Sequence, residues 1–508
     1  MNTRESAKEA FLAACAAAFD KAIPSEQAEN GGTFTQAERQ GLATGRMLAA
    51  VLLEKWLALH GVGRGLDRDR CERCKGRLRI QEAAQVRCLS TTVGEVEYRR
   101  AYVVCDRCGL CYAPLDCAAG IPPTGGSVWR THQLCDAAVL NRSFEGAAHA
   151  LERHDGIEIS GKQVRVIAET EGAELVDRRR EAVQAFQTGW RPPAPSQVGE
   201  LLVVTADGGR LRTRQIPDES PPEGERSKRS SWREDKLGSV YDAVPIEDRR
   251  GISPETYQGA QARLPGRGQA QTKTYVASLA PWEEVGWMLC LEAWERGYAQ
   301  TRTKLFLSDG AESLRTVRQT HFPDATFILD WYHAVERLSM CSKAAFGEGK
   351  PTAIAWYEEM KDHLWAGRTA VIQQALERES ERIGRPDPGE SSTSPRVILH
   401  RGVHYVSENK DGMAYPRFRE QWWPLASGVA EGGVKQFGIR LKGSEKFWNH
   451  VNQGLGAEEM LALSALLLSE DGRWDRYWEA RGRPYRREVR SLNPPVSPPT
   501  KPEGGPSG

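Results

Sequence analysis

Two closely spaced pairs of cysteines give this sequence its clearest metal-binding signal. Cys71 and Cys74 form one pair, Cys105 and Cys108 form the other, and 30 residues separate the two pairs. Zinc is held by four thiolates in tetrahedral geometry, and a pair with this spacing presents two sulfurs to a shared ion. The chain has 11 cysteines. Disulfides are rare in intracellular proteins, so metal binding explains the clustered cysteines better than disulfides do. The spacing therefore predicts a structural Zn²⁺ site; two unrelated thiol pairs are the alternative, and Cys111 could replace one ligand.

Two aspartates follow apolar segments that are typical of buried strands. Asp207 ends the segment LLVVTAD, and Asp309 ends the segment KLFLSD. Each is followed by glycine, so each aspartate alone is explained by a turn. Because the ends of neighbouring strands align in a sheet, the two carboxylates together predict a shared site for a pair of divalent ions. Such a site needs a third acid.

The third acid is predicted to be Glu431, at the start of a helix for which Ser427 would be the N-cap. Lys435 lies one turn later on the same helix face, where it could contact a phosphate. Gly432 and Gly433 follow the glutamate directly. Two glycines at this point predict a loose start to the helix.

A possible helix-turn-helix lies between the cysteines and the acids. The segment SFEGAAHALERH predicts a first helix, DGIEIS predicts a turn, and a second helix is predicted from Ser160 to about residue 174. Lys162, Gln163 and Arg165 stand near the start of the second helix, where a recognition helix would meet DNA. An αα-hairpin that does not contact DNA is the alternative.

The elements that must position these residues are predicted from the periodicity of the apolar side chains. Helical spacing predicts helices within residues 7–22 and 35–60, and the alternating stretch 93–104 predicts a β-hairpin. Further strands are predicted at 201–209, 273–279, 304–309 and 325–330, and further helices at 282–298, 310–320 and 331–384. The segments 386–395 and 491–508 are rich in proline, serine and glycine, which predicts disorder.

Composition limits the class of protein. With 508 residues, of which 40% are hydrophobic and 27% charged, the chain is predicted to fold into several domains of about 100–200 residues each. The formal net charge is +1, so any basic surface for nucleic acid must be regional. The sequence has no apolar run of the roughly 18 residues that a membrane span needs. Its polar start lacks the apolar core of a signal peptide, so we expect a cytoplasmic protein.

Taken together and in order, these motifs resemble a known family. The cysteine pairs, TADG, LSDG, ILDWYHAVERL, and SGVAEGGVK followed by RLKG are similar to those of the bacterial insertion-sequence transposases of the ISKra type. These transposases belong to the Mutator-like group of DDE enzymes, which have a ribonuclease-H-like catalytic domain. The resemblance covers about residues 30–480.

The resemblance implies a role for individual residues. Asp207 and Asp309 match the two aspartates of the family, and Glu431 matches its glutamate. Asp330 and His333 match the Asp-x-x-His signature that these transposases carry between the second and third acids. We expect Asp330 and His333 to support the site without binding the metal.

The predicted fold is therefore a multidomain one. Helical, zinc-ribbon and helix-turn-helix modules are expected to precede an α/β catalytic domain of ribonuclease-H-like architecture, with Asp207 on its first strand, Asp309 just after its fourth and Glu431 on a late helix. The predicted regions are a helical region at 1–65, a zinc ribbon at 66–125, a helix-turn-helix-like region at 126–195, the catalytic domain at 196–480 with a helical insertion at about 331–420, and a basic, disordered tail at 481–508.

The implied activity is DNA transposition. The protein would bind the terminal inverted repeats of its insertion sequence as a homo-oligomer in the bacterial nucleoid, and would catalyse strand cleavage and strand transfer into target DNA. Mg²⁺ or Mn²⁺ would be held by Asp207, Asp309 and Glu431, since such ions prefer oxygen ligands, whereas Zn²⁺ would be structural. A catalytically inactive zinc-ribbon regulator derived from a transposase and a non-mobile nuclease are the alternatives.

Overall fold

The structure is a computed structural model, and it forms two compact units. It describes residues 3–23, 33–62, 70–71, 73–214, 232–244, 269–421, 423–443, 446–449 and 456–484. The first unit contains Met1–Gln133, Ala150–Glu158 and Arg476–Gly508, and the second contains Leu134–His149 and Ile159–Asp475. The predicted region 126–195 is thus divided between the units. The predicted disordered segment 491–508 lies outside the described residues.

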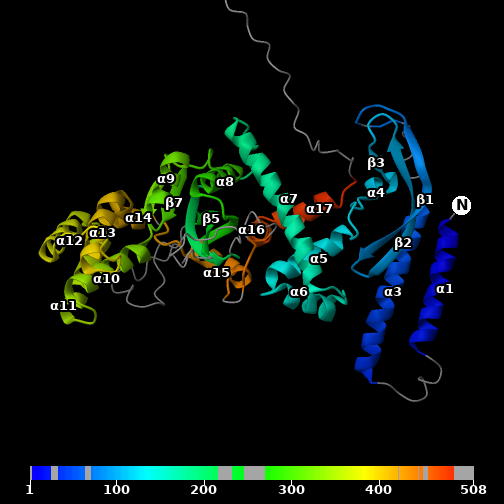
Figure 1. Cartoon of the computed structure of the whole chain (residues 1–508), viewed down its shortest axis with the longest axis horizontal. Helices are drawn as coiled ribbons and strands as arrows, with labels where there is room; N and C mark the ends of the chain where they lie inside the picture. The colour runs from blue at the N-terminus through cyan, green and yellow to red at the C-terminus, as the bar shows by residue number, and fades with distance from the viewer. Residues whose placement is uncertain are drawn as a thin grey trace, which may run out of the picture. The chain divides into compact units, whose positions relative to one another are not determined.

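In the first unit, two long helices accompany a small antiparallel sheet (Figure 1). The predicted helices are confirmed as α1 (Arg4–Ala22) and α3 (Phe34–His60), and the side chains of Thr3 and Thr33 cap their first turns. The sheet has the order β1-β2-β3 and is followed by a short helix. Its elements are β1 (Leu78–Thr91), β2 (Gly94–Cys105), β3 (Cys111–Tyr112) and α4 (Pro114–Ala119).

A β-hairpin is present, but the stretch predicted to form all of it is only its second strand, and the first strand lies before that stretch. The alternating stretch forms β2, and β1 pairs with it from Leu78 opposite Cys105 to Thr91 opposite Gly94. The side chains of Val96 and Tyr98 are buried on one face of β2, where they pack with Leu57 of α3. Alternation along the strand therefore builds the core of this unit.

The second unit is built on a five-stranded mixed sheet with the order β6-β5-β4-β7-β8. The antiparallel pairs are β4–β5 and β5–β6, and the parallel pairs are β4–β7 and β7–β8. The strands are β4 (Leu201–Arg212), β5 (Trp232–Val244), β6 (Gln269–Ser278), β7 (Thr303–Ser308) and β8 (Thr326–Leu329). The sequence did not predict β5, in which four charged residues, 233–236, follow one another.

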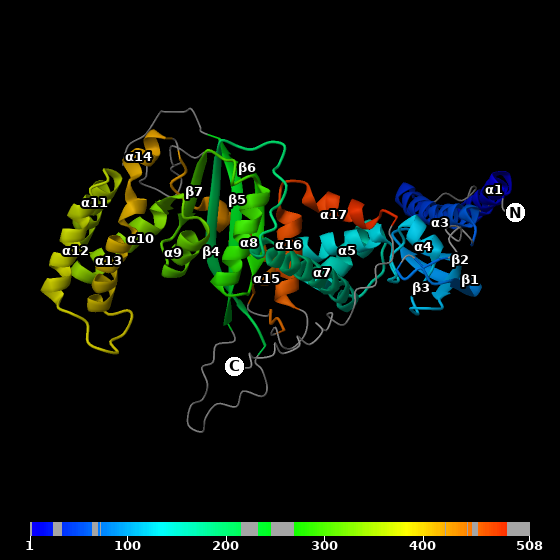
Figure 2. The same cartoon turned by 90° about the horizontal axis from the view of Figure 1, so that it is seen from above.

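Helices cover both faces of this sheet (Figure 2). A side chain added at Gly238 of β5 would meet Leu289 of α8 (Trp282–Glu295), whereas the neighbouring Leu237 lies against Gly433 of α15 (Gly428–Leu441). Successive residues of a strand point to opposite faces, so α8 and α15 lie on opposite sides. Between β7 and β8, the chain forms α9 (Glu312–His321).

The predicted helical insertion between β8 and α15 is present (Figures 1 and 2). Its helices are α10 (Trp331–Phe346), α11 (Pro351–Trp365), α12 (Thr369–Ile383), α13 (Pro395–Asn409) and α14 (Tyr415–Glu420). The segment 386–395 was predicted to be disordered, which is wrong: it forms turns in which Arg396 pairs with both Asp387 and Glu390.

The predicted helix pair is also present. After α5 (Val128–Leu140), the first helix is α6 (Phe144–Ala150) with a π-helical turn at Leu151–Asp155, and the second is α7 (Gly161–Gln187). The second helix is longer than predicted, because its buried face packs along α16 (Ala457–Leu468). The last described helix is α17 (Arg473–Arg481).

Candidate active site and metal centres

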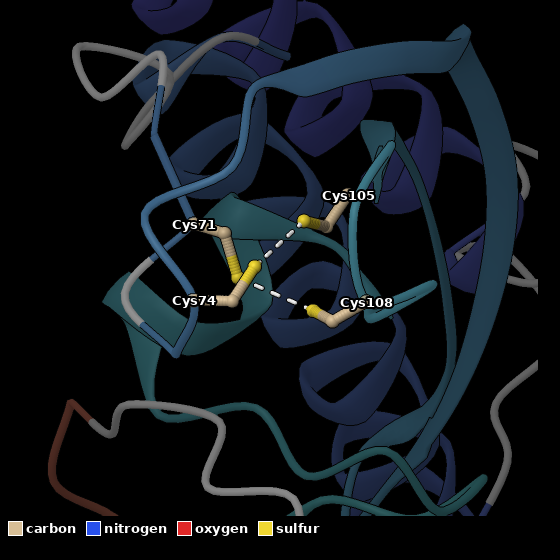
Figure 3. Close-up of side chains that lie close together, drawn as sticks. All are labelled: Cys71, Cys74, Cys105 and Cys108. Carbon is tan, nitrogen blue, oxygen red and sulfur yellow. Dashed lines mark hydrogen bonds between the residues drawn. The ribbon is translucent and has the colours of Figure 1, made fainter.

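The four cysteines predicted to bind zinc come together in the first unit (Figure 3). The sulfur of Cys71 lies 3.7 Å from that of Cys108, and the sulfur of Cys74 lies 3.4 Å from that of Cys105. Four thiolates at about 2.3 Å from one Zn²⁺ in tetrahedral geometry have sulfurs about 3.8 Å apart. The donor set and its spacing therefore fit a closed, four-coordinate metal site.

Both cysteine pairs reach this geometry through the same backbone turn. The N–H of Lys75 donates to the carbonyl of Cys71, and the N–H of Gly109 donates to the carbonyl of Cys105. The residue after the second cysteine has a positive φ in both turns, 59° at Lys75 and 69° at Gly109. Glycine adopts this conformation without strain, whereas a lysine there needs a surrounding structure that holds it.

One of the four cysteines, Cys105, has an environment that favours a thiolate. Backbone N–H groups of Cys108 and Arg107 donate to the Cys105 sulfur and lower its pKa to about 6. A metal-bound cysteine must be deprotonated, so these donors assist metal binding. The backbone N–H of Leu110 lowers the pKa of Cys108, but burial and hydrogen bonds with the other three thiols raise it overall. Cys111 is outside the cluster, and its thiol donates instead to the carbonyl of Gly109.

Three aspartates lie at the same level near the ends of three neighbouring parallel strands, Asp207 within β4 and Asp309 and Asp330 directly after β7 and β8. In the sheet register, Thr205 pairs with Leu307, and Ser308 pairs with Leu329. Counting on from these pairs places Asp207, Asp309 and Asp330 in one row across β4, β7 and β8. This row is the structural basis of the candidate active site. Asp309 directly follows the adjacent strand β7, whereas Asp207 lies within β4 and does not end it, because the strand continues to Arg212.

The second unit gathers negative charge around Asp207. Burial raises the pKa of Asp207, and the carboxylates of Asp309 and Glu431 raise it further, whereas the Gly208 N–H and His333 lower it. Carboxylates close enough to repel one another are typical of a site that holds a cation. Oxygen atoms of this kind are the ligands that Mg²⁺ and Mn²⁺ take.

Glu431 reaches the aspartates because α15 packs closely against the sheet. Its neighbour Gly433 is buried, and a Cβ atom there would lie 2.8 Å from Leu237 and 2.9 Å from Tyr275. The prediction of a loose helix start is therefore wrong at Gly433, where the missing side chain allows close contact. At the preceding residue, Gly432, an added Cβ atom would meet nothing within 4 Å.

Asp330 is completely buried and joins the end of β8 to two other elements. Its Oδ1 accepts the backbone N–H of His333 at 2.9 Å, and its Oδ2 accepts the backbone N–H of Ser427 at 2.5 Å. Burial alone would raise the pKa of Asp330, but these hydrogen bonds and the His333 ring lower it below its usual value. Ser427 is the N-cap of α15 by position, but its side chain makes no capping hydrogen bond.

His333 lies between Asp330 and the other acids. Its Nδ1 is 3.1 Å from the Asp330 Oδ1. This hydrogen bond, with the nearby charges of Asp309 and Asp207, raises the pKa of His333 to about 9. Near these acids, the group of described residues whose ligand atoms lie close enough to hold one metal ion is His333, Asp330 and Glu431, which the sequence did not predict; Asp207 and Asp309 are not members of it.

The other predicted site residues are placed in different ways. Lys435 is exposed on α15, one turn after Glu431, and Lys162 is exposed on α7. The side-chain oxygen of Gln163 accepts a hydrogen bond from the backbone N–H of Ser160 in a capping box. This part of the amide therefore stabilises the first turn of α7. Arg165 is half-buried and faces Glu169 on the same helix at 3.8 Å.

One residue near the acids had no signal in the sequence. The hydroxyl of Tyr405, on α13, donates to the backbone carbonyl of Asp309 at 2.8 Å. The two residues are 96 positions apart, and a single tyrosine within a helical segment does not indicate a contact over that distance. Tyr405 thereby anchors the loop that carries Asp309.

Comparison with known proteins gave no family: no protein-family model matches the chain, and no curated protein matches it. The arguments for function therefore depend on the chain's own residues. Of the helices that the structure describes, none combines the length and the hydropathy that crossing a membrane requires.

Proposed function

We propose that this chain is a DNA transposase of the DDE type, which cleaves and joins DNA strands at the ends of an insertion sequence. The strongest support for this proposal is the convergence of three carboxylates. Asp207 on β4 is level with Asp309, which directly follows the adjacent parallel strand β7, and Glu431 approaches them from a helix more than 100 residues away in the sequence. Single Asp-Gly turns do not require this convergence.

The three carboxylates would hold the divalent ions that phosphoryl transfer on DNA requires. When bound, a pair of Mg²⁺ or Mn²⁺ ions supplies an activated water or 3′-hydroxyl and stabilises the leaving oxygen. The acids act as ligands in this scheme, and their mutual repulsion in the metal-free protein favours binding a cation. Asp330 and His333 would act as positioning residues, since Asp330 has hydrogen bonds at both carboxylate oxygens.

The arrangement of the second unit supports a ribonuclease-H-like architecture for the catalytic part. Asp207 lies on the first strand of its sheet in chain order, Asp309 follows the fourth, and Glu431 lies on a late helix. This is the placement that the family resemblance implies. The four-cysteine turns likewise support a zinc ribbon, and the helix pair supports DNA binding.

The test is cleavage of a labelled duplex that carries one end of the element, in Mg²⁺ or Mn²⁺. Asp207→Asn, Asp309→Asn and Glu431→Gln keep the size of each side chain and remove the charge. Each variant should lose nearly as much activity as the triple variant, because ligands of one metal site act as a unit. End binding, followed in a gel-shift assay, should persist in every variant.

Each other outcome has a definite meaning. Normal cleavage by Glu431→Gln alone would make Asp330 or Glu312 the third acid. Normal cleavage by all three variants would contradict the transposase proposal. Specific end binding by a wild-type protein that never cuts would favour a DNA-binding regulator, and cleavage without inverted repeats beside the gene would favour a nuclease.

A further inference from the structure

A small basic pocket in the second unit lies apart from the acids. It has a volume of about 250 Å³ and is lined by residues from α6, α7, α15, the end of β4 and the loop after α15. Five of its lining residues are cationic and two are acidic. The cationic residues are Arg142, Arg165, Arg214, Arg440 and Lys446. The pocket therefore favours an anionic ligand.

Arg440 is the residue that points most clearly to a ligand. It is only 3% exposed, and its Nε donates to the carbonyl of Ala138 at 2.6 Å. Its Nη2 is buried and has no hydrogen-bond partner among the described residues. A buried, charged donor that is left without a partner is costly, so a site of this kind is completed by an acceptor such as a phosphate oxygen.

Aromatic rings surround the same guanidinium. Its central carbon lies 4.0 Å from the ring centre of Phe144 and 5.2 Å from that of Trp448. Next to Trp448, Phe447 also lines the pocket, and 48% of its surface is exposed. An exposed aromatic ring beside a cluster of arginines is the combination that binds the base and the phosphate of a nucleotide.

Backbone hydrogen bonds fix the segment that carries Trp448 beside the end of β4. The N–H of Trp448 donates to the carbonyl of Arg212, and the N–H of Arg214 donates to the carbonyl of Trp448. The ammonium group of Lys446 donates to the carbonyls of Ile439 and Arg440 at the end of α15. The pocket is therefore a built site, connected to the same strand that carries Asp207.

We infer that this pocket binds a single nucleotide unit, with the phosphate against Arg440 and its neighbouring arginines and the base stacked on Phe447. Its volume is below the roughly 300–1,000 Å³ of pockets for drug-sized ligands, so it admits one unit and excludes a duplex. The nucleotide would come from an unpaired position of a DNA strand or from a free nucleotide. The first source rests on the proposed function; the second does not.

The helix pair then has a different role from the predicted one. Arg142 lies just before α6 and Phe144 is its first residue, and Arg165 stands in the first turns of α7. All three face one pocket, so the pair would hold an unpaired nucleotide. This role does not require the start of α7 to enter a groove of the duplex.

The test measures binding of the full-length protein to three fluorescent probes: dAMP, a single-stranded 20-mer, and the blunt duplex of the same sequence. Phe447→Ala should weaken binding of the single strand roughly tenfold, since base stacking on an aromatic residue contributes about 1–3 kcal/mol. Arg142→Ala should weaken it too, with a smaller dependence on salt concentration. Both residues are exposed, so the fold should be unaffected.

Trp190→Ala is the matched control, because Trp190 is also 48% exposed but does not line the pocket. It should bind all three probes as the wild type does. Duplex binding should change little in Phe447→Ala. If dAMP binds and responds to Phe447→Ala while neither DNA probe binds, the pocket takes free nucleotides, and the inference holds although the proposed function fails.

Other results would overturn the inference. If cleavage depends on Asp207 while Phe447→Ala binds the single strand and dAMP normally, the pocket is not a nucleotide site and the proposed function still stands. A poly-glutamate peptide that competes with the single strand equally well in wild type and Phe447→Ala would assign the pocket to an acidic peptide.

Discussion

The carboxylate of Asp330 accepts a hydrogen bond from the backbone N–H of Ser427, 97 residues further along the chain. This bond ties the end of β8 to the start of α15, the helix that carries Glu431. The carboxylate is fully buried and also holds the N–H and ring of His333. Asp330 thus links three parts of the candidate active site.

Replacing Asp330 with asparagine should therefore destabilise the protein. The asparagine side chain has one acceptor oxygen, but its NH₂ group would face the backbone N–H of either His333 or Ser427. That buried N–H group would then have no acceptor. We expect a loss of about 2–4 kcal/mol in the free energy of unfolding, measured with urea. Asp411→Asn, at an exposed aspartate, is the control and should change it by less than about 0.5 kcal/mol. Equal stabilities of the two variants would contradict this role.

His333→Ala should slow DNA cleavage while leaving the binding of catalytic metal intact. The ring is hydrogen-bonded to Asp330, and its positive charge faces Asp207 and Asp309. Loss of a group that orients metal ligands typically costs about 10–100-fold. Cleavage rates and Mn²⁺ titrations should be compared with His404→Ala, an exposed histidine on α13. A wild-type rate would make His333 a structural residue, and loss of metal binding would make it a ligand.

The full-length protein should contain about one zinc per chain by metal analysis, because one four-cysteine cluster is present among the described residues. Cys74→Ser should lose the zinc and lower the thermal stability of the first unit. Cys111→Ser should keep both, since the Cys111 sulfur bonds to a carbonyl outside the cluster. A fully folded first unit after treatment with a chelator would contradict a structural metal.

Two adjacent glycines of α15 should respond in opposite ways to alanine. Gly433→Ala would place a methyl group 2.8 Å from Leu237, so we expect destabilisation of about 1–3 kcal/mol and slower cleavage as Glu431 moves. At Gly432 nothing lies within 4 Å of the added atom, so alanine should stabilise the helix by up to about 1 kcal/mol. Urea unfolding measures both, and similar effects would contradict the close packing.

Glu169 should make stability fall as the pH rises. Burial raises the pKa of Glu169 to about 7; Arg165 and Arg440 oppose the shift, and Glu459 adds to it. A pKa above the unfolded value means that the folded state binds the proton more tightly. The folded protein is therefore most stable, as far as Glu169 is concerned, below about pH 4.3, the pKa of this group in the unfolded chain. This contribution to the free energy of unfolding is lost as the pH rises through about 7.

Glu169→Gln should remove this dependence. Relative to the wild type, the variant should gain about 1–3 kcal/mol of stability between pH 5 and pH 8 in urea unfolding. Glu283→Gln, at an exposed glutamate of α8, is the control and should follow the wild-type curve. Parallel curves for Glu169→Gln and the wild type would show that the carboxylate is ionised in the folded protein throughout this range.

Elements with strong local patterns could be predicted from the amino-acid sequence. Cysteine pairs predict their own turns, because two residues between ligands fix a local geometry. Apolar runs predicted β4, β6, β7 and β8, since a buried strand has few polar side chains. Strand β5 was missed because four consecutive charged residues, 233–236, hide the pattern of a strand. The turns at 386–395 were missed because composition does not show the ion pairs of Arg396.

Which residues contact one another in the candidate sites depends on the folded chain as a whole. The row of Asp207, Asp309 and Asp330 depends on the register of three parallel strands, and a register is set by pairing across the sheet and not by neighbours in the chain. The approach of Glu431 to the aspartates depends on the space left by Gly433. In the sequence alone, a glycine at this position indicates only a weak helix. The basic pocket joins five segments of the chain, so no local pattern could show that Arg440 lies between Phe144 and Trp448.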